Sequence, residues 1–175
     1  MITKLFVKYL FPKEAALSVH HINYNKLWQK GIRGLIFDID NTLATFDIPH
    51  PPDEIISLLS GLAAKGFKIA LLSNNNESRV RKFCKDLKCS CIWKAGKPKL
   101  SGISKAAAML DLRKNQIALI GDQIFTDCLC GNRYGAYTIL TKPIAKRDEW
   151  TVRLKRWPEK PILCAYLKHI KGRKE

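Results

Sequence analysis

Short apolar runs alternate with amphipathic helical patterns along the middle of this chain, and this alternation constrains its fold most. Each run is short enough for a buried strand, and the segments between runs repeat hydrophobic residues at helical spacing. The predicted strands are residues 33–39, 67–73, 91–93, 117–121 and 136–140, and the predicted helices are residues 53–65, 77–87, 101–111 and 127–134. Because strands alternating with helices form βαβ units, we expect an α/β fold of three layers, Rossmann-like, with a central parallel sheet of about five strands.

Length and composition are consistent with one globular domain. The chain has 175 residues, of which 46% are hydrophobic and 26% charged, so it has enough apolar surface to form a core. No run of 18 apolar residues occurs, and the N-terminus lacks the uninterrupted apolar stretch of a secretory signal. We therefore expect no membrane-spanning helix and a cytoplasmic location.

Six cysteines raise two structural alternatives. A disulfide framework is not expected, because no secretion signal is present. The pairs Cys89/Cys91 and Cys128/Cys130 offer four thiolates for zinc, but structural zinc sites usually use CxxC spacing. We therefore favour small buried hydrophobic residues as the role of these cysteines.

The net charge of +16 is concentrated at the two ends of the chain. Residues 1–33 carry six Lys or Arg and one Glu, and residues 141–175 carry eleven Lys or Arg against four acidic residues. Residues 34–140 are nearly balanced, with fourteen against ten. We therefore predict a basic N-terminal extension (1–33), a core domain (34–141) and a basic C-terminal extension (142–175), the extensions being suited to an anionic partner.

Polar and charged side chains follow the predicted strands at the points where they end. Ligands of parallel α/β sheets bind beyond these carboxyl ends, so the side chains are expected to converge. They are Asp38 and Asp40 after the first strand, Ser73 and Asn74 after the second, Lys97 after the third, and Asp122 and Asp127 after the fourth.

This set of residue types suits phosphoryl transfer. The pair Asp38 and Asp40 provides one nucleophile and one proton carrier. With Asp122 and Asp127 they form four carboxylates, whose mutual repulsion Mg²⁺ would relieve. Ser73 and Lys97 can bind the phosphoryl oxygens. Taken singly, each residue could have an ordinary non-catalytic role, such as a turn-forming aspartate or a solvated lysine. The combination of all of them at the strand ends favours the catalytic interpretation.

The ordered motifs resemble those of the haloacid dehalogenase (HAD) superfamily of phosphohydrolases. Asp38, Asp40 and Thr42 match its DxDxT motif, and Ser73 and Lys97 match its second and third motifs. Gly121, Asp122 and Asp127 match its fourth motif, GDxxxxD. The stretches GIRGLIFDIDNTL, SNNNESRV and KAGKPK further resemble the YqeG-like family, which belongs to subclass IIIA and is similar to mitochondrial phosphatidylglycerophosphate phosphatases. Cys128 and Cys130 depart from the aliphatic or small residues expected there.

The resemblance implies a role for each matching residue. Asp38 would attack phosphorus, and Asp40 would protonate the leaving alkoxide and then activate water. Ser73, Asn74 and Lys97 would bind the phosphate. Mg²⁺ would be held by Asp38, the Asp40 backbone carbonyl, Asp122 and Asp127.

The spacing of the motifs leaves no room for the cap domains that select small substrates in the superfamily. Asp40 and Ser73 are 33 positions apart, and Ser73 and Lys97 are 24 apart. Each gap holds about one helix with its loops. We therefore expect a capless enzyme whose open site accepts a large or surface-bound substrate.

The basic flanks suggest where such a substrate is found. Residues 1–11 place apolar side chains near one helical face, with Lys4 and Lys8 beside it; they are Ile2, Leu5, Phe6, Tyr9 and Leu10. Such a segment is typical of membrane-surface binding, with packing onto the domain as the equal alternative. Basic residues also accompany the C-terminal aromatic residues Trp150, Trp157 and Tyr166, which favours a membrane interface.

Three functions follow from these observations. The favoured one is removal of the terminal phosphate of phosphatidylglycerophosphate in phospholipid synthesis, by an enzyme peripheral to the inner membrane face. A capless phosphatase of nucleic-acid ends or phosphosugars is the first alternative, and a nucleic-acid-binding protein with a decayed site is the second. No RNA-binding signature is present, so a nucleic-acid partner is not expected.

Overall fold

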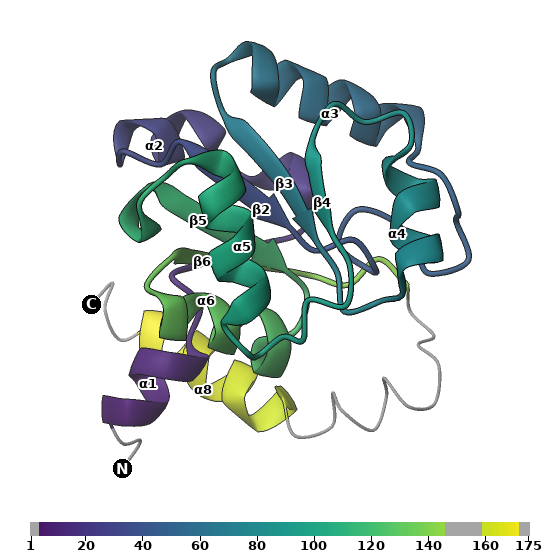
Figure 1. Cartoon of the computed structure of the whole chain (residues 1–175). Helices are drawn as coiled ribbons and strands as arrows, with labels where there is room; N and C mark the ends of the chain where they lie inside the picture. Colours follow the sequence, from purple (N-terminus) through teal and green to yellow (C-terminus); the bar gives the residue numbers. More distant parts are fainter. Residues whose placement is uncertain (1–3, 146–158, 172–175) are drawn as a thin grey trace.

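The centre of the computed structural model is one six-stranded sheet, in which all neighbouring strands are parallel (Figure 1). The structure describes residues 4–145 and 159–171, so Trp150 and Trp157 lie outside the described residues. The strands are β1 (Glu14–Ala16), β2 (Gly34–Phe37), β3 (Lys68–Leu72), β4 (Ser90–Ile92), β5 (Ile117–Gly121) and β6 (Tyr137–Thr141), in the spatial order β1-β6-β5-β2-β3-β4. The predicted α/β fold with a central parallel sheet is confirmed.

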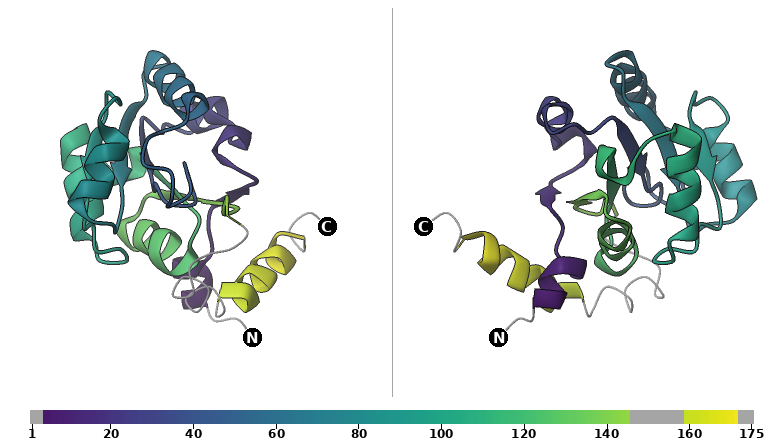
Figure 2. Two further views of the ribbon diagram at one scale, coloured as in Figure 1. Left: turned by 90° about the vertical axis from the view of Figure 1, so that its right-hand side faces the viewer. Right: turned by 60° about the vertical axis from the view of Figure 1, so that its left-hand side comes forward.

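Helices cover both faces of the sheet and complete the three layers (Figure 1 and Figure 2). Side chains of α5 and α6 belong to the core on one face, and side chains of α2, α3 and α4 belong to the core on the other. The described α-helices are α1 (Lys4–Leu10), α2 (Tyr24–Gln29), α3 (Asp53–Ala64), α4 (Glu77–Cys84), α5 (Ser101–Leu110), α6 (Leu129–Tyr134) and α8 (Glu159–Lys171). Short 3-10 turns occur at Val19–His21 and Lys114–Gln116, and a π-helical turn occurs at Ile124–Cys128.

The strands divide their side chains between the two cores, because successive residues of a strand point to opposite faces. In β2, Leu35 and Phe37 join the core beneath α2, α3 and α4, whereas Ile36 joins the core beneath α5 and α6. A strand covered on both faces is apolar at nearly every position, which explains why these strands are visible in the sequence as apolar runs.

Two elements before residue 33 are not predicted from the sequence. The strand β1 has only three residues, Glu-Ala-Ala, and pairs with β6 at the edge of the sheet, so it carries no apolar run. The helix α2 has six residues and buries Tyr24 and Leu27. Residues 14–29 therefore contribute to the sheet and its core, and the sheet has six strands where about five were expected.

A third apolar cluster joins the two ends of the described chain. Leu10 of α1 and the following Phe11 belong to this cluster together with Tyr166 of α8. The rings of Phe11 and Tyr166 meet edge to face, with centroids 5.5 Å apart. The Asn132 side chain of α6 donates hydrogen bonds to the backbone oxygens of Tyr9 and Phe11, each at 2.9 Å. One side of α1 is therefore held against the domain, next to α8 (Figure 2).

The cysteines correct one expectation. Cys84 at the end of α4 and Cys91 in β4 form a disulfide, although none was expected. The short connection from α4 to β4 brings the two residues together. Cys89 packs against the core beneath α2, α3 and α4, whereas Cys130 lies in the core on the opposite face, so the two CxC pairs do not form one thiolate cluster.

The segments between the strand ends are short, as the motif spacing predicts. Among the described elements, only α3 lies between β2 and β3, and only α4 lies between β3 and β4. No cap domain is inserted in either segment. None of the helices within residues 4–145 and 159–171 has the length and apolar character needed to cross a bilayer.

Candidate active site

The first two predicted site residues lie where β2 ends. The backbone N–H of Asp38 donates to the oxygen of Ile120 in β5 at 2.9 Å, so Asp38 continues the strand pairing. The chain then turns sharply: Asn41 has a φ of 66°, and Leu43 N–H donates to the oxygen of Ile39 at 2.9 Å. This turn aims Asp38 and Asp40 at different partners on the carboxyl edge of the sheet.

Lys97 brings two of the predicted carboxylates together. Its Nζ lies 2.5 Å from Asp38 Oδ1 and 2.7 Å from Asp127 Oδ1, and its side chain is only 3% exposed. Burial alone lowers the pKa of Lys97, but the charges of Asp127 and Asp38 outweigh it and raise the pKa above its usual value. Lys97 is therefore a permanent buried cation between two carboxylates.

Asp127 reaches this cluster because of the π-helical turn Ile124–Cys128, which precedes α6. Its Oδ2 accepts a hydrogen bond from the backbone N–H of Gln123 at 3.1 Å, which fixes the carboxylate. Gly121 at the end of β5 leaves the space for it, since a Cβ at that position would overlap the Asp127 carboxylate. The predicted helix 127–134 therefore starts three residues earlier than expected, and the added turn orients a site residue.

Three carboxylates form a group that could hold a metal ion. One oxygen from each of Asp38, Asp122 and Asp127 lies within 4.8 Å of the others, and all three residues are buried. Burial raises the pKa of Asp38 to about 7, partly opposed by the charge of Lys97. Hard oxygen donors crowded in this way fit Mg²⁺. The carboxylate of Asp40 is not part of this group, so only three of the four predicted carboxylates converge.

Asp40 instead lies in a cradle of three hydrogen-bond donors. Ser73 Oγ donates to its Oδ2 at 3.2 Å, and Asn75 Nδ2 approaches the same oxygen at 3.5 Å. Arg79 Nη2 donates to its Oδ1 at 3.2 Å. The Asp40 side chain keeps 21% of its surface exposed, more than Lys97 does, so it borders the accessible side of the site.

Asn74 holds Lys97 in place in this structure. Its Nδ2 donates to the backbone oxygen of Lys97 at 3.0 Å, and its Oδ1 accepts from the Lys97 backbone N–H at 2.7 Å. These two bonds join the loop after β3 to the loop after β4. The predicted contact of Asn74 with phosphate stays a prediction.

Arg79 of α4 is a site residue that the sequence interpretation missed. Its side chain is 10% exposed, and its guanidinium lies 5.3 Å from the ring centroid of Phe83. Its Nη2 pairs with Asp40 and also donates to the backbone oxygen of Thr45 at 3.3 Å, whereas among the described residues Nε and Nη1 have no hydrogen-bond partner. Its position could have been inferred from the helical spacing of the sequence. Arg79 lies four residues before the apolar Phe83 and thus on the inner face of the same helix.

Comparison with known proteins places this site in context. A family model described as HAD-hydrolase-like matches residues 94–165. The probable phosphatase YqeG of Bacillus subtilis is 37% identical over 158 residues, which cover 90% of this chain and 92% of that protein.

A second relative and a solved structure extend the comparison. Phosphatidylglycerophosphate phosphatase 1 of Arabidopsis thaliana is 26% identical over 92% of this chain, which spans about half (49%) of that longer protein. The 3-deoxy-D-manno-octulosonate 8-phosphate phosphatase of Moraxella catarrhalis, solved with magnesium and phosphate ions, superposes with a TM-score of 0.50 at 18% identity, over 69% of this chain and 84% of that one. At this identity the likeness concerns the fold alone.

Proposed function

The chain belongs to the YqeG-like family of HAD phosphatases, and from this premise we propose that it removes the terminal phosphate of phosphatidylglycerophosphate with Asp38 as nucleophile. The observation that carries the proposal is the buried group of Asp38, Lys97, Asp122 and Asp127, beside a separately held Asp40. The substrate is suggested by the similarity to the Arabidopsis phosphatase.

The proposed reaction has two steps. A carboxylate oxygen of Asp38 attacks phosphorus, the bond to the glycerol oxygen breaks, and Asp40 gives a proton to the leaving alkoxide. Asp40 then takes a proton from water as this water attacks the aspartyl phosphate, which releases phosphate and restores Asp38. Asp40 is partly exposed, so it can exchange protons with solvent, and the contacts with Ser73 and Arg79 fix its orientation.

The charges around Asp38 support the first step. Lys97 remains cationic and can stabilise the negative charge of the phosphoryl oxygens. Asp38, Asp122 and Asp127, with the backbone carbonyl of Asp40, would hold Mg²⁺, which supplies further positive charge at the transferring phosphoryl group.

The short connections and the basic flanks support a membrane-borne substrate. Without a cap domain, nothing in the described chain limits the site to a small metabolite. The excess of Lys and Arg in residues 1–33 and 141–175 would attract an anionic lipid surface. We therefore propose that the enzyme acts at the cytoplasmic face of a membrane, as a peripheral protein.

The test is phosphate release from phosphatidylglycerophosphate in mixed micelles, with Mg²⁺ and then with EDTA. A 3′-phosphorylated oligonucleotide and a small phosphosugar serve as competing substrates. We expect metal-dependent release from the lipid and at least about a thousandfold loss in Asp38→Asn, with an unchanged circular dichroism spectrum. Preferred release from the oligonucleotide or the sugar would contradict the substrate, and substantial activity of Asp38→Asn would contradict the nucleophile.

A further inference from the structure

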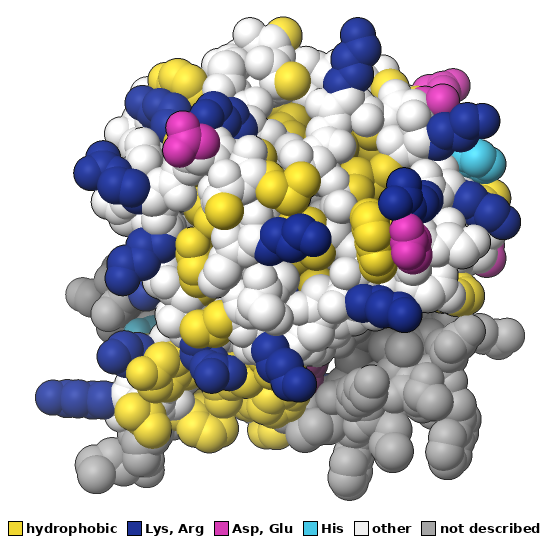
Figure 3. All heavy atoms as spheres, viewed as in Figure 1, with side chains coloured by type: hydrophobic (Ala, Val, Ile, Leu, Met, Phe, Trp, Pro, Cys, Tyr) yellow, Lys and Arg dark blue, Asp and Glu magenta, His cyan; other side chains and the backbone are white. Residues whose placement is uncertain are grey.

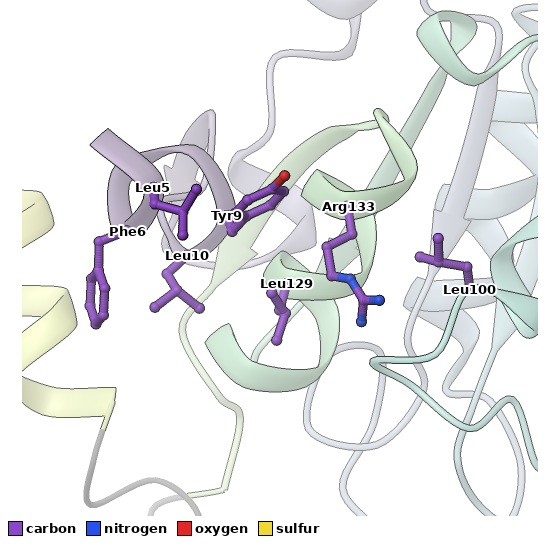
Figure 4. Close-up of a pocket in the computed structure, with 7 residues that line it drawn as sticks. All are labelled: Leu5, Phe6, Tyr9, Leu10, Leu100, Leu129 and Arg133. Atoms are coloured by element: carbon purple, nitrogen blue, oxygen red, sulfur yellow. The ribbon is translucent and has the colours of Figure 1, made fainter. Parts of the chain in front are cut away.

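An open apolar groove of about 530 Å³ lies between α1 and α6 (Figure 4). Apart from Arg133, every residue that lines it is hydrophobic or aromatic: Leu5, Phe6, Tyr9 and Leu10 from α1, Leu129 from α6, and Leu100. Leu5 and Phe6 are 67% and 45% exposed, although the inner side of the same helix packs on the domain. A volume of this size is typical of small-molecule sites.

The walls of this groove are continuous with the segments that carry the active site. Leu100 follows Lys97 by three residues, and Leu129 follows Asp127 by two. Arg133 connects the two walls, because its Nη1 donates to the backbone oxygen of Pro98 at 3.2 Å. Its guanidinium stands between Leu129 and Leu100 in Figure 4. A ligand in the groove would therefore lie next to the loop that presents Lys97.

The charged residues that line the groove, or stand directly next to a lining residue in the sequence, are basic. Lys4 and Lys8 neighbour Leu5 and Tyr9, Lys99 neighbours Leu100, and Arg133 itself lines the groove. Lys4, Lys8, Lys99 and Arg133 are exposed. Figure 3 shows the result on one face of the molecule, where hydrophobic side chains gather at the position of α1 and α6 and Lys and Arg side chains border them. An apolar groove with a cationic border complements a ligand that has an apolar chain and an anionic headgroup.

We propose that this groove binds one acyl chain of an anionic phospholipid, with the headgroup at Arg133 and the neighbouring lysines. The proposal rests on the proposed function, since it assigns an acyl chain of the lipid substrate to a site outside the catalytic cluster. It also explains why α1 combines an anchored face with an exposed apolar face.

The test uses lysophosphatidylglycerol below its critical micelle concentration, titrated calorimetrically into the full-length protein. This lipid has one chain and an anionic headgroup but no terminal phosphate, so its binding is independent of catalysis. We expect saturable binding that is at least about tenfold weaker for glycerophosphoglycerol, which lacks the chain, and weaker for the zwitterionic lysophosphatidylcholine.

The matched variants are Leu5→Ser/Phe6→Ser and Met109→Ser. Leu5 and Phe6 lie on the exposed side of α1, so their replacement spares the anchoring residues Val7 and Leu10. Met109 is 51% exposed near the far end of α5 and does not line the groove. We expect the double variant to bind the lysolipid about tenfold more weakly and Met109→Ser to bind like the wild type.

Three outcomes would overturn the proposal: no saturable binding, equal binding by the double variant, or a dimer in sedimentation that only the double variant loses. The last would assign the groove to a second copy of the chain. Lysolipid binding without hydrolysis of phosphatidylglycerophosphate would contradict the proposed function and leave the groove assignment standing. Hydrolysis of phosphatidylglycerophosphate without lysolipid binding would contradict the groove assignment and leave the proposed function standing.

Discussion

At the scale of single residues, the buried charges around Asp38 dominate the energetics of the site. A buried ion pair seldom adds net stability, because the cost of desolvation offsets the attraction between the charges. Lys97 is nevertheless buried between Asp38 and Asp127, and the three carboxylates of Asp38, Asp122 and Asp127 lie within 4.8 Å. Such a cluster is best understood as a functional arrangement that costs the fold some stability.

The raised pKa of Asp38 predicts how metal-free stability depends on pH. The folded-state pKa is about 7 against an ordinary value of 3.8, so the folded state holds the proton more tightly. The resulting stabilisation is complete below pH 4 and is lost as the pH rises through 7. In EDTA, the free energy of unfolding should fall by up to ~3 kcal/mol between pH 5 and pH 8.

Urea unfolding at several pH values measures this effect, and Asp38→Asn should largely remove it. Asp86→Asn changes an exposed carboxylate outside the cluster and should preserve the slope. An unchanged slope in Asp38→Asn would show that another group is responsible.

Arg79 is expected to position Asp40. Replacing it by Met keeps much of the packing on Phe83 but removes the donor to Asp40, so the proton carrier loses its fixed orientation. We expect kcat to fall by roughly 10- to 100-fold with a smaller change in KM. Arg79→Lys should recover part of this loss.

Arg81→Met is the matched control. Arg81 lies on the same helix as Arg79, but its side chain is exposed and pairs with Glu77. Steady-state kinetics on a soluble phosphomonoester compares the variants, and a purely structural role of Arg79 would lower the melting temperature without changing kcat per folded molecule.

At the scale of elements, the loops after the strands determine the geometry of the site. The loop after β5 depends on a glycine, since Gly121→Ala would place a methyl group where the Asp127 carboxylate lies. We expect this variant to displace Asp127, lower the affinity for Mg²⁺ and reduce kcat by at least about tenfold. Isothermal titration with Mg²⁺ and a kinetic assay would measure both effects.

Gly61→Ala in α3 provides the contrast for this prediction. No atom lies within 4 Å of a Cβ at Gly61, and the position is inside an exposed part of a helix. Alanine should therefore stabilise the protein by about 0.5–1 kcal/mol and leave kcat unchanged. Full activity of Gly121→Ala would contradict the importance of the space at Gly121.

The sequence predicts those elements whose pattern is local. The five predicted strands are present. β2, β3 and β5 are buried apolar runs, and β5 has the predicted bounds, whereas β4 has only three residues and buries only Ile92. The strand β1 is not visible, because its pairing with β6 across more than a hundred residues is not encoded in its own three residues. The disulfide between Cys84 and Cys91 likewise follows from the packing of α4 beside β4.

The active site, too, is predicted from the sequence only where the pattern is local. Asp38, Asp122, Asp127 and Lys97 are predicted as a set because each follows a strand, and parallel strands end at one edge. Whether Asp40 joins the metal group or turns toward Ser73 and Arg79 depends on side-chain directions after a sharp turn, which the spacing of residues does not specify.

At the scale of the whole molecule, metal binding should stabilise the fold. A ligand that binds only the folded state at 100 times its Kd adds about 2.7 kcal/mol, which raises the melting temperature of a chain of this size by roughly 5–10 °C. We expect this rise with Mg²⁺ in differential scanning fluorimetry. Asp122→Asn should lose it, and an equal shift in that variant would place the metal elsewhere.

The turn after β2 is hydrogen-bonded to the segment that follows β6. Ile144 and Ala145 donate hydrogen bonds to the backbone and side-chain oxygens of Asn41, at 3.1 and 3.3 Å. Asn41 stands directly between Asp40 and Thr42, so these two bonds couple the chain beyond β6 mechanically to the proposed proton carrier. A displacement of residues 144 and 145 would therefore shift Asn41, and with it the adjacent residue Asp40.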